Sequence, residues 1–287
     1  MKMKISDDTS STRQMNKTNT TQGNIISDKQ KEYVQTIKRN QIKVRLLQFI
    51  IFVGFLILWE ISATNEWINS FIFCSPSKLF TTFLSMLEDG SLLHHIGITL
   101  YETLIGFGIV ITGSLLIATL FWWNETLSKV LEPYLVILNA LPKSALAPVL
   151  IVWLGANKFT IIVCACSVAI FGSILNIYSG FINIDNDKIK LIKTLKGNRF
   201  QCLRLVVLPS NIPNILSIMK VNIGLCLVGV VIGEFLAARE GLGYLIIYGS
   251  QTFKMSNVLL SIMILCIIAM FLYMLLQHIE KKLSEYF

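Results

Sequence analysis

Apolar runs separated by short polar segments follow one another along the chain after residue 45. Each run is long enough to cross about 30 Å of hydrocarbon as a helix. The runs cover residues 46–63, 95–123, 131–155, 159–182, 214–236 and 258–277. A shorter stretch, 78–87, places its apolar residues on one helical face and predicts a helix lying on the outer membrane surface. The pattern predicts an all-α polytopic membrane protein whose six-helix transmembrane domain covers residues 46–280.

Residues 1–45 have a different composition from the rest of the chain. They are rich in Ser, Thr, Asn, Lys and Gln and contain almost no aromatic residues. A segment of this kind buries too little apolar surface to offset the entropy lost on folding, so we expect a disordered cytosolic tail. No apolar segment follows Met1 at the distance typical of a cleavable signal peptide.

Composition excludes several classes of protein. The chain of 287 residues is 54% hydrophobic and 15% charged, with a mean hydropathy of +0.64, which is more apolar surface than an ordinary soluble domain buries. The net charge of +8 comes from basic residues that flank the apolar runs and do not form the clustered surface of a nucleic-acid-binding protein. Six cysteines without a CxxC pair or a histidine cluster predict neither a zinc site nor a disulfide framework.

The sequence motifs of common enzymes are also missing. There is no GxxxxGKS/T loop to hold ATP phosphates, and there is no GxSxG or HExxH motif. His94, His95 and His278 stand at the edges of apolar runs. The sequence therefore predicts a non-catalytic chain without a cofactor, in which any ATP-driven work needs a separate subunit.

The positions of the basic residues predict the orientation in the membrane. Lys and Arg are enriched in the cytoplasmic loops of membrane proteins. With six spans and the N terminus inside, only Lys78, Lys158, Arg239 and Lys254 fall on the outer side. We therefore expect a multi-pass protein of the plasma membrane with both termini in the cytoplasm.

A polar, basic island at residues 183–213 separates the fourth and fifth runs. Ile189 and Ile192 recur at helical spacing, the pattern breaks at 197–198 and then resumes until Pro209, which predicts two short helices that meet at a turn. The basic residues of the island are Lys188, Lys190, Lys193, Lys196, Arg199 and Arg204. Two interpretations are open: docking in a groove of a partner protein, or contact with anionic lipid head groups.

The third apolar run contains two prolines and a lysine. Pro142 and Pro148 each remove a helical hydrogen bond and predict kinks. Carbonyls freed within a bilayer need protein or water as partners, and Lys143 would be costly if it faced lipid. We expect these three residues to line a translocation pathway or to pair between helices. A kinked helix with only a packing role is the alternative.

Two acidic residues lie within apolar runs. Glu102 in the second run and Glu234 at the end of the fifth are costly in a membrane unless they are paired or hydrated, which makes them candidates for a pathway or gate. A hydrogen-bonded structural role is equally open for Glu102. Gly241 and Gly243 follow Glu234 and would let the backbone turn sharply at the outer face.

Three stretches resemble the permease subunits of binding-protein-dependent ABC importers, in particular the nitrate, sulfonate and taurine type. They are TLKGNRFQCLRLVVLPSNIPNI at 194–215, PKSALAPVLIVWLG at 142–155, and Glu234 followed by GLGY at 241–244. The resemblance covers about residues 46–277. It implies the six-span, MetI-like fold of type I importers.

The resemblance also implies that the island is the cytoplasmic loop that couples the permease to an ATPase. Family members usually carry a Glu-Ala-Ala triad, a Gly and a later hydrophobic-Leu-Pro. Here Lys196 stands where Gly is usual and Gly197 where Ala is usual, and a Gly one step along would still supply the positive φ of a sharp corner. The coupling residues implied in this way are Lys190, Leu191 and Ile192 at the triad, with Leu195, Lys196, Gly197, Arg199, Leu208 and Pro209.

The partners implied by the resemblance are a cytosolic ATPase dimer, an extracytoplasmic solute-binding protein and a second copy of the permease. Membrane lipid surrounds the spans of this chain, and no nucleic acid is expected as a partner. The solute would be small, of the sulfonate, nitrate or taurine class or a vitamin precursor. An ion-coupled secondary transporter or channel is the alternative from another class, in which Glu102, Lys143 and Glu234 would couple transport to an ion gradient. A membrane scaffold without transport is a third hypothesis.

Overall fold

The structure is a computed structural model of the chain. It describes residues 43–51, 53–65 and 74–284, together with the single positions 33, 36 and 39. Nearly all of the expected disordered tail, residues 1–45, lies outside the described residues, so that expectation stays a prediction.

The chain forms two compact units, Met1–Trp67 and Ile68–Phe287. The first unit contains the helix Lys43–Thr64, which is long and apolar enough to cross a membrane. This helix corresponds to the first apolar run of the sequence.

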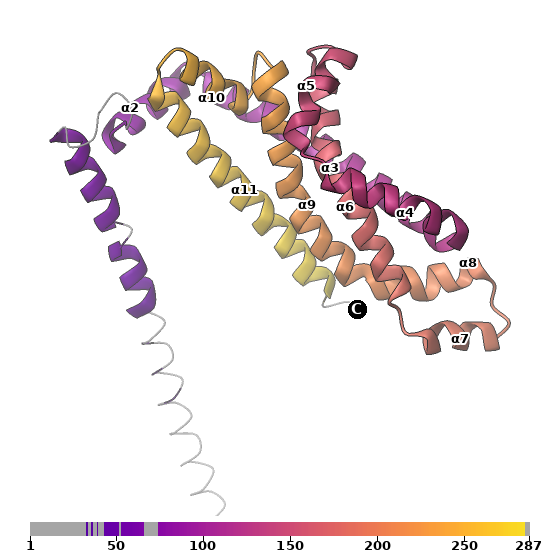
Figure 1. Ribbon diagram of the computed structural model, residues 1–287. Helices are drawn as coiled ribbons and strands as arrows, with labels where there is room; N and C mark the ends of the chain where they lie inside the picture. The colour runs from indigo at the N-terminus through magenta and orange to yellow at the C-terminus, as the bar shows by residue number, and fades with distance from the viewer. Residues whose placement is uncertain are drawn as a thin grey trace, which may run out of the picture. The chain divides into compact units, whose positions relative to one another are not determined.

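The second unit is built from helices (Figure 1). In chain order they are α2 (Pro76–Glu88), α3 (Ser91–Trp123), α4 (Glu125–Ala140), α5 (Lys143–Leu154), α6 (Lys158–Ile182), α7 (Asn186–Thr194), α8 (Arg199–Cys202), the π-helical turn η1 (Leu203–Val207), α9 (Leu208–Ala237), α10 (Leu242–Gln251) and α11 (Met255–Ser284). Figure 1 shows α9 and α11 side by side, with α10 at one end of the unit and α7 and α8 at the other.

The centre of this unit is the packing of α3, α6 and α9. Ala165 on α6 is fully buried. A Cβ atom added at Gly106 of α3 would lie 3.1 Å from the Ala165 Cβ, and one added at Gly229 of α9 would lie 2.6 Å from the Ala165 Cα. Small residues on all three helices therefore let their backbones approach closely, as is common between membrane helices.

Five helices of the described chain are long and apolar enough to cross a membrane, and the α4–α5 pair makes a sixth if it is one span bent by 97°. The expectation of one kinked helix over 131–155 is wrong: the chain breaks between α4 and α5. Leu141 is extended, with φ −61° and ψ 138°, and Pro142 is the N-cap of α5. A proline disfavours the helical conformation in the residue before it, here Leu141, which explains the break. Pro148 lies inside α5 without ending it.

The polar island also differs from the expected pair of short helices. The first helix is α7, but the second does not end at Pro209, because Arg199–Ala237 runs as one helical stretch of 39 residues. A proline has no N–H to donate. The π-helical turn lies directly before Pro209, with the Leu208 N–H donating to the Leu203 carbonyl. The wider turn changes the hydrogen-bond register where the proline lacks a donor, so the helix continues through it.

Candidate functional site

The turn between α7 and α8 has the hydrogen bonds of a Schellman C-cap. The Gly197 N–H donates to the Ile192 carbonyl at 2.9 Å and the Lys196 N–H to the Lys193 carbonyl at 3.0 Å. The residue with positive φ is Lys196, at +58°. The expectation that Gly197 supplies the positive φ is therefore wrong. The left-handed position of this motif falls on the lysine, one residue earlier.

Gly197 is needed for a different reason, which is close contact. A Cβ atom at this position would lie 2.5 Å from the Ile192 Cγ2 and 2.9 Å from the Ile192 carbonyl oxygen. Both distances are shorter than the closest contacts that Cβ atoms make in proteins. In this turn, Lys196 therefore adopts a conformation that favours glycine, while Gly197 stands where Ile192 leaves no room for a side chain.

The helix after this turn is fixed at its start. Asn198 and Gln201 form a reciprocal capping box, with each side chain accepting the other residue's backbone N–H at 2.8 Å. The Arg199 guanidinium donates to the Trp123 carbonyl at the C-terminal end of α3, at 3.2 Å. A cation is favourable at that end of a helix. The second half of the island is therefore anchored to α3 as well as continuous with α9.

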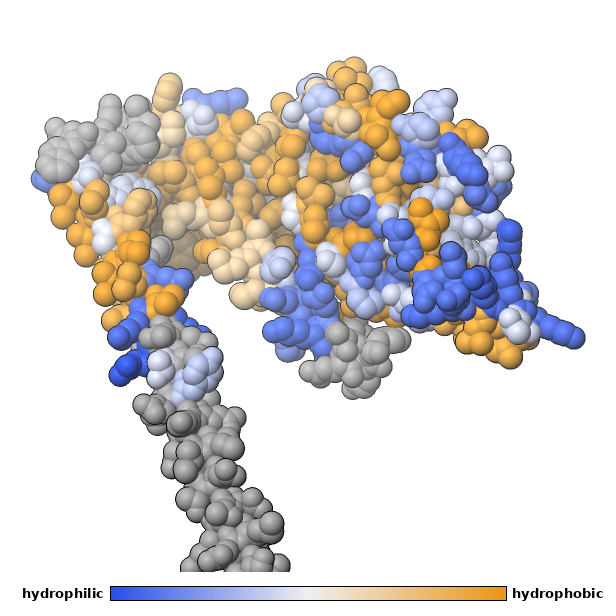
Figure 2. Space-filling view, turned by 60° about the horizontal axis from the view of Figure 1, so that its bottom comes forward, coloured by the Kyte–Doolittle hydropathy of each residue, from blue (hydrophilic) through white to orange (hydrophobic). Residues whose placement is uncertain are grey.

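Basic and apolar side chains lie together on this segment. Lys190 forms an ion pair with Asp187 at 2.9 Å, while Ile192 is half-buried at the turn and Leu208 and Pro209 are half-buried where α9 begins. Figure 2 shows hydrophilic and apolar side chains next to each other at the end of the unit that carries α7 and α8. The most exposed apolar side chains here are Leu191 (61%), Leu195 (71%), Phe200 (56%) and Leu205 (61%). We call residues 186–205 the helical arm.

A second cluster lies at the other end of α9, around Glu234. Its carboxylate accepts hydrogen bonds from the Thr99 hydroxyl at 2.7 Å and from the Gly243 N–H at 2.6 Å. The Leu242 N–H donates to the same Thr99 hydroxyl at 2.9 Å, and the Gly241 N–H donates to His95 Nδ1 at 2.9 Å. Residues of α3 and α9 therefore hold the turn 238–241 and the start of α10 in place.

The two glycines of this segment let the backbone reach the Glu234 carboxylate. Gly241 has φ +105°, and a Cβ atom there would overlap the carboxylate. A Cβ atom at Gly243 would lie 2.7 Å from Glu234 Oε2. Only Gly241 has the positive φ of a sharp turn, since Gly243 is already in α10. The sequence placed these residues near one another, and the structure adds that they are in direct contact.

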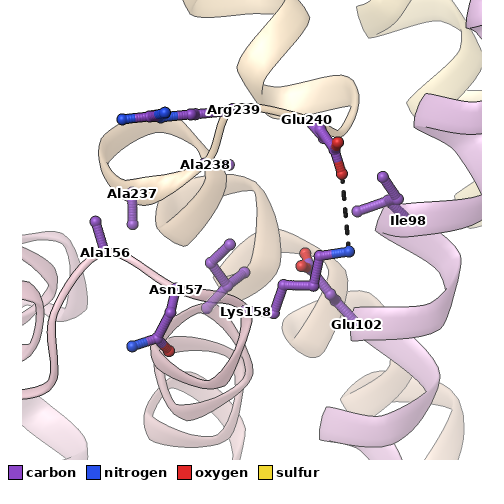
Figure 3. Close-up of a pocket in the computed structure, with 10 residues that line it drawn as sticks. Ile98, Glu102, Ala156, Asn157, Lys158, Ala237, Ala238, Arg239 and Glu240 are labelled. Carbon is purple, nitrogen blue, oxygen red and sulfur yellow. Dashed lines mark ion pairs between the residues drawn. The ribbon is translucent and has the colours of Figure 1, made fainter.

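Glu102 lies beside Glu234 and is 1% exposed. The two carboxyl groups are within hydrogen-bonding reach of each other. Glu102 also lines a cavity of about 270 Å³ between α3, the start of α6 and the segment 237–240 (Figure 3). The four residues expected at a pathway or gate on this side, Glu102, Glu234, Gly241 and Gly243, therefore share one buried site.

Lys143 lies elsewhere, at the break between α4 and α5. Its ammonium group donates to the Leu138 carbonyl near the end of α4 and lies 5.0 Å from the centre of the Phe171 ring on α6. Among the described residues, no hydrogen bond or ion pair joins Lys143 to Glu102 or Glu234. The prolines and Lys143 thus form a site separate from the carboxyl cluster.

Several partners in these sites carried no signal in the sequence. In the sequence, His95 is one residue at the edge of an apolar run and Thr99 is an ordinary polar residue inside that run, so neither indicates a contact with Glu234 or Gly241.

An ion pair outside the two sites joins Lys220 on α9 to Glu280 on α11 at 2.7 Å, with side-chain exposures of 16% and 25%. A lone lysine in an apolar run is a sign of a buried partner, but the sequence does not identify the partner.

The chain is similar to several known proteins. The family model described as binding-protein-dependent transport system inner membrane component matches residues 105–285. The chain is 30% identical over 232 residues to a probable ABC transporter permease protein of Haemophilus influenzae, covering 80% of this chain and 94% of that protein. It is 24% identical to the putative aliphatic sulfonates transport permease protein SsuC of Bacillus subtilis, covering 80% of this chain and 83% of that protein.

A relative named for a different solute is the formylaminopyrimidine transport permease protein ThiX of Halalkalibacterium halodurans, at 27% identity over 68% of this chain and 77% of that protein. Among solved structures, the methionine ABC transporter MetNI in inward-facing conformations matches with a TM-score of 0.59 and 16% identity, over 68% of this chain and 97% of the matched chain. At that identity, the likeness to the solved structure shows a shared fold.

Proposed function

Because this chain belongs to the family of binding-protein-dependent transport inner-membrane components and is an ABC importer permease subunit, we propose that it forms the translocation pathway for a small solute and couples transport to ATP hydrolysis by a separate ATPase. The observation that carries this proposal is the helical arm, which exposes Leu191 and Leu195 before its turn and Phe200 and Leu205 after it. The part after the turn continues without a break into α9. Exposed apolar side chains on a short helix suit a groove on a partner protein.

The proposed mechanism uses the helix Arg199–Ala237 as a lever. At 1.5 Å per residue its length measured along the helix is about 58 Å. The arm lies at one end and the Glu234 cluster at the other, and α8 is set at an angle to α9 (Figure 1). When two ATPase subunits close on ATP, each moves the arm docked on it, and a rigid helix transmits that movement to the turn 238–241. The bent α4–α5 pair with Pro142, Lys143 and Pro148 lies against α6 and α9 and rearranges with them.

The remaining parts of the assembly follow from the same proposal. Both termini and the arm face the cytoplasm, in line with the basic residues of the loops, and a solute-binding protein delivers its ligand at the α10 side. A second copy of the chain completes the pathway at a two-fold interface. The relatives named for aliphatic sulfonates and formylaminopyrimidine support a small polar organic solute, of the sulfonate class or a vitamin precursor.

The arm is tested by placing a charge on its exposed apolar face. Leu195→Asp is expected to abolish co-purification of the ATPase and ATP-driven uptake, while membrane insertion is unchanged because the side chain is 71% exposed. Lys193→Asp is the matched control, since two residues turn a helix by about 200° and place Lys193 on the opposite side of α7. Equal ATPase recovery with both variants would contradict the proposed dock.

The buried carboxyl groups of Glu102 and Glu234 favour one competing function, an ion-coupled transporter. Uptake into proteoliposomes separates the two hypotheses. If the chain is an ABC permease, uptake requires the ATPase and ATP on the side of the membrane that carries the ATPase, and vanadate stops it. Uptake that is driven by an ion gradient without the ATPase, and that stops with an ionophore, would support the competing function.

A further inference from the structure

The start of α10 is held by three consecutive backbone N–H groups, each bonded to a side chain of α3 or α9. The acceptors, from residue 241 to residue 243, are His95 Nδ1 at 2.9 Å, the Thr99 hydroxyl at 2.9 Å and the Glu234 carboxylate at 2.6 Å. The first N–H groups of a helix have no partner within the helix, so these side chains close this end of α10. We call the bond between His95 and Gly241 the latch.

His95 is the one acceptor of the three that a proton disables. An imidazole that accepts at Nδ1 carries its proton on Nε2, whereas an imidazolium carries a proton on both nitrogens and accepts no hydrogen bond in any orientation. A hydroxyl such as that of Thr99 does not titrate, and a carboxyl group such as that of Glu234 keeps a free lone pair when it is protonated. Protonation of His95 therefore leaves the Gly241 N–H without its acceptor.

The ring of His95 is within reach of protons from solution. His95 is half-buried in the second turn of α3, with its ring centre 5.9 Å from that of His94 and 6.3 Å from that of Tyr244 on α10. The charged groups that act on it are His94 on its own helix and Glu240 in the turn 238–241. One of these two groups precedes Gly241 directly in the chain, so it belongs to the same turn as the latch.

Glu240 has two partners from other helices. Its carboxylate is 3.6 Å from His94 Nε2 and 3.7 Å from the ammonium group of Lys158 on α6, and Figure 3 shows the Lys158 side chain reaching toward it. A proton on His94 makes the first of these contacts an ion pair. Acidification therefore removes a hydrogen bond at residue 241 and adds an attraction at residue 240, so the turn changes its partners on α3.

We propose that His95 and Gly241 form a proton-sensitive latch, which is closed when His95 is neutral and open when His95 is protonated. The latch holds the turn 238–241, where the proposed lever delivers its movement, so opening it lets the start of α10 move. The stability that the latch contributes is present at high pH and is lost as the pH falls through the titration of His95. Histidine ordinarily titrates near pH 6.5, so the comparison is between pH 8 and pH 5. The inference goes beyond the proposed permease function, which requires no titratable group at this turn.

Two measurements on the full-length chain in lipid nanodiscs test the latch. The chain has three histidines, so ¹⁵N NMR of their ring nitrogens is readily assigned with His94→Asn and His278→Asn, which leave His95 in place. We expect a neutral His95 ring with its proton on Nε2 at pH 8 and an imidazolium at pH 5. Hydrogen exchange of the Gly241 amide, corrected for the intrinsic effect of pH, is expected to show about five- to tenfold less protection at pH 5, since one hydrogen bond is lost.

Two variants of His95 fix the limits of this response. His95→Asn places an amide oxygen, which does not titrate, close to the position of Nδ1, and is expected to keep the Gly241 amide protected at both pH values. His95→Ala removes the acceptor and is expected to leave that amide weakly protected at both. His278→Asn, which changes an exposed histidine on α11, is the matched control and is expected to respond to pH as the unchanged protein does.

Three results would overturn the latch. They are a neutral His95 ring with its proton on Nδ1, equal protection of the Gly241 amide at pH 8 and pH 5, and a pH response that survives in His95→Asn but is lost in His94→Asn. The measurements need no ATPase, binding protein or solute. ATP-driven uptake by a chain whose Gly241 amide ignores pH would reject the latch and leave the proposed function standing, and a working latch in a chain without uptake would do the reverse.

Discussion

The turn of the helical arm gives a prediction in which two neighbouring substitutions have opposite effects. Lys196 has φ +58°, a conformation that costs a residue with a side chain about 1–2 kcal/mol relative to glycine. The lysine is exposed, so replacing it removes little packing. Lys196→Gly is therefore expected to stabilise the turn by about 1 kcal/mol, after allowing for the greater flexibility of glycine in the unfolded chain.

Gly197→Ala is expected to act in the other direction. The added Cβ would lie 2.5 Å from the Ile192 Cγ2 and 2.9 Å from the Ile192 carbonyl oxygen. The side chain can rotate away, but the carbonyl cannot move without weakening the hydrogen bond that it accepts from the Gly197 N–H. Overpacking of this kind costs about 1–3 kcal/mol.

Hydrogen exchange of the backbone amides measures both effects, because the opening of a short segment is read locally. The Lys196 and Gly197 amides close the turn and are the reporters. A stabilisation of about 1 kcal/mol slows their exchange about fivefold. Gly197→Ala is expected to speed it by about five- to hundredfold and to reduce ATPase co-purification in parallel.

Lys193→Gly is the control for the lysine-to-glycine change. It makes the same replacement within α7, where the backbone is helical, so it is expected to destabilise the arm by about 0.5–1 kcal/mol. Faster exchange with Lys196→Gly, or unchanged exchange with Gly197→Ala, would refute the explanation of the turn by positive φ and close contact.

Three further predictions concern the helix bundle. Gly241→Ala, whose Cβ would overlap a buried carboxylate, is expected to reduce uptake severely and to expose the turn to proteolysis. Gly90→Ala also places alanine at a positive φ, +70°, but with open space around it, and should cost only about 1 kcal/mol. Gly229→Ala, whose Cβ would lie 2.6 Å from the backbone of α6, is expected to lower the thermal unfolding temperature. Gly224→Ala, which has nothing within 4 Å, should leave that temperature unchanged, and equal temperatures for the two variants would contradict the close packing. Lys220→Met leaves the carboxylate of Glu280 on α11 unpaired and is expected to lower the free energy of unfolding, measured by thermal unfolding, by about 1–3 kcal/mol. Replacing both Lys220 and Glu280 by methionine should restore part of that free energy.

The second half of the helical arm and the Glu234 cluster occupy opposite ends of one helical stretch, Arg199–Ala237, which is the basis of the proposed lever. Arg199 is bonded to the end of α3, and Glu234 is bonded to Thr99 near the start of α3. A movement of α9 relative to α3 therefore changes both ends together. Pro209 lies near the end of this stretch that carries the arm, and the helix continues through it after the π-helical turn.

The apolar pattern of the sequence predicted the long helices well, because a stretch of twenty apolar residues has few folding options in a membrane. The helix expected over 78–87 is α2, which begins two residues earlier, at Pro76, because Ser75 caps it and Pro76 stands in its first turn. The predicted break at 197–198 was correct to within one residue. The prediction that Gly197 supplies the positive φ was wrong, because the position of the left-handed residue depends on the residue at which α7 ends.

Continuity through Pro209 and the break at Pro142 show why proline alone does not decide a helix. In one case the π-helical turn shifts the hydrogen bonds so that the missing N–H is tolerated, and in the other the preceding Leu141 becomes extended. The same residue type therefore allows opposite outcomes. Which one occurs depends on the packing of the neighbouring helices.

The sequence by itself determined which segments are apolar enough to become membrane helices, where polar breaks separate them, and that Glu102, Glu234 and Lys143 need partners, because burial of charge has a cost at any position in a bilayer. Only the tertiary structure decided what those partners are. The Thr99 hydroxyl reaches Glu234 across 135 residues of sequence, and Lys143 lies over the Phe171 ring on α6, with no carboxylate paired to it among the described residues. Such contacts depend on how helices pack side by side, which the spacing of residues within one helix does not encode.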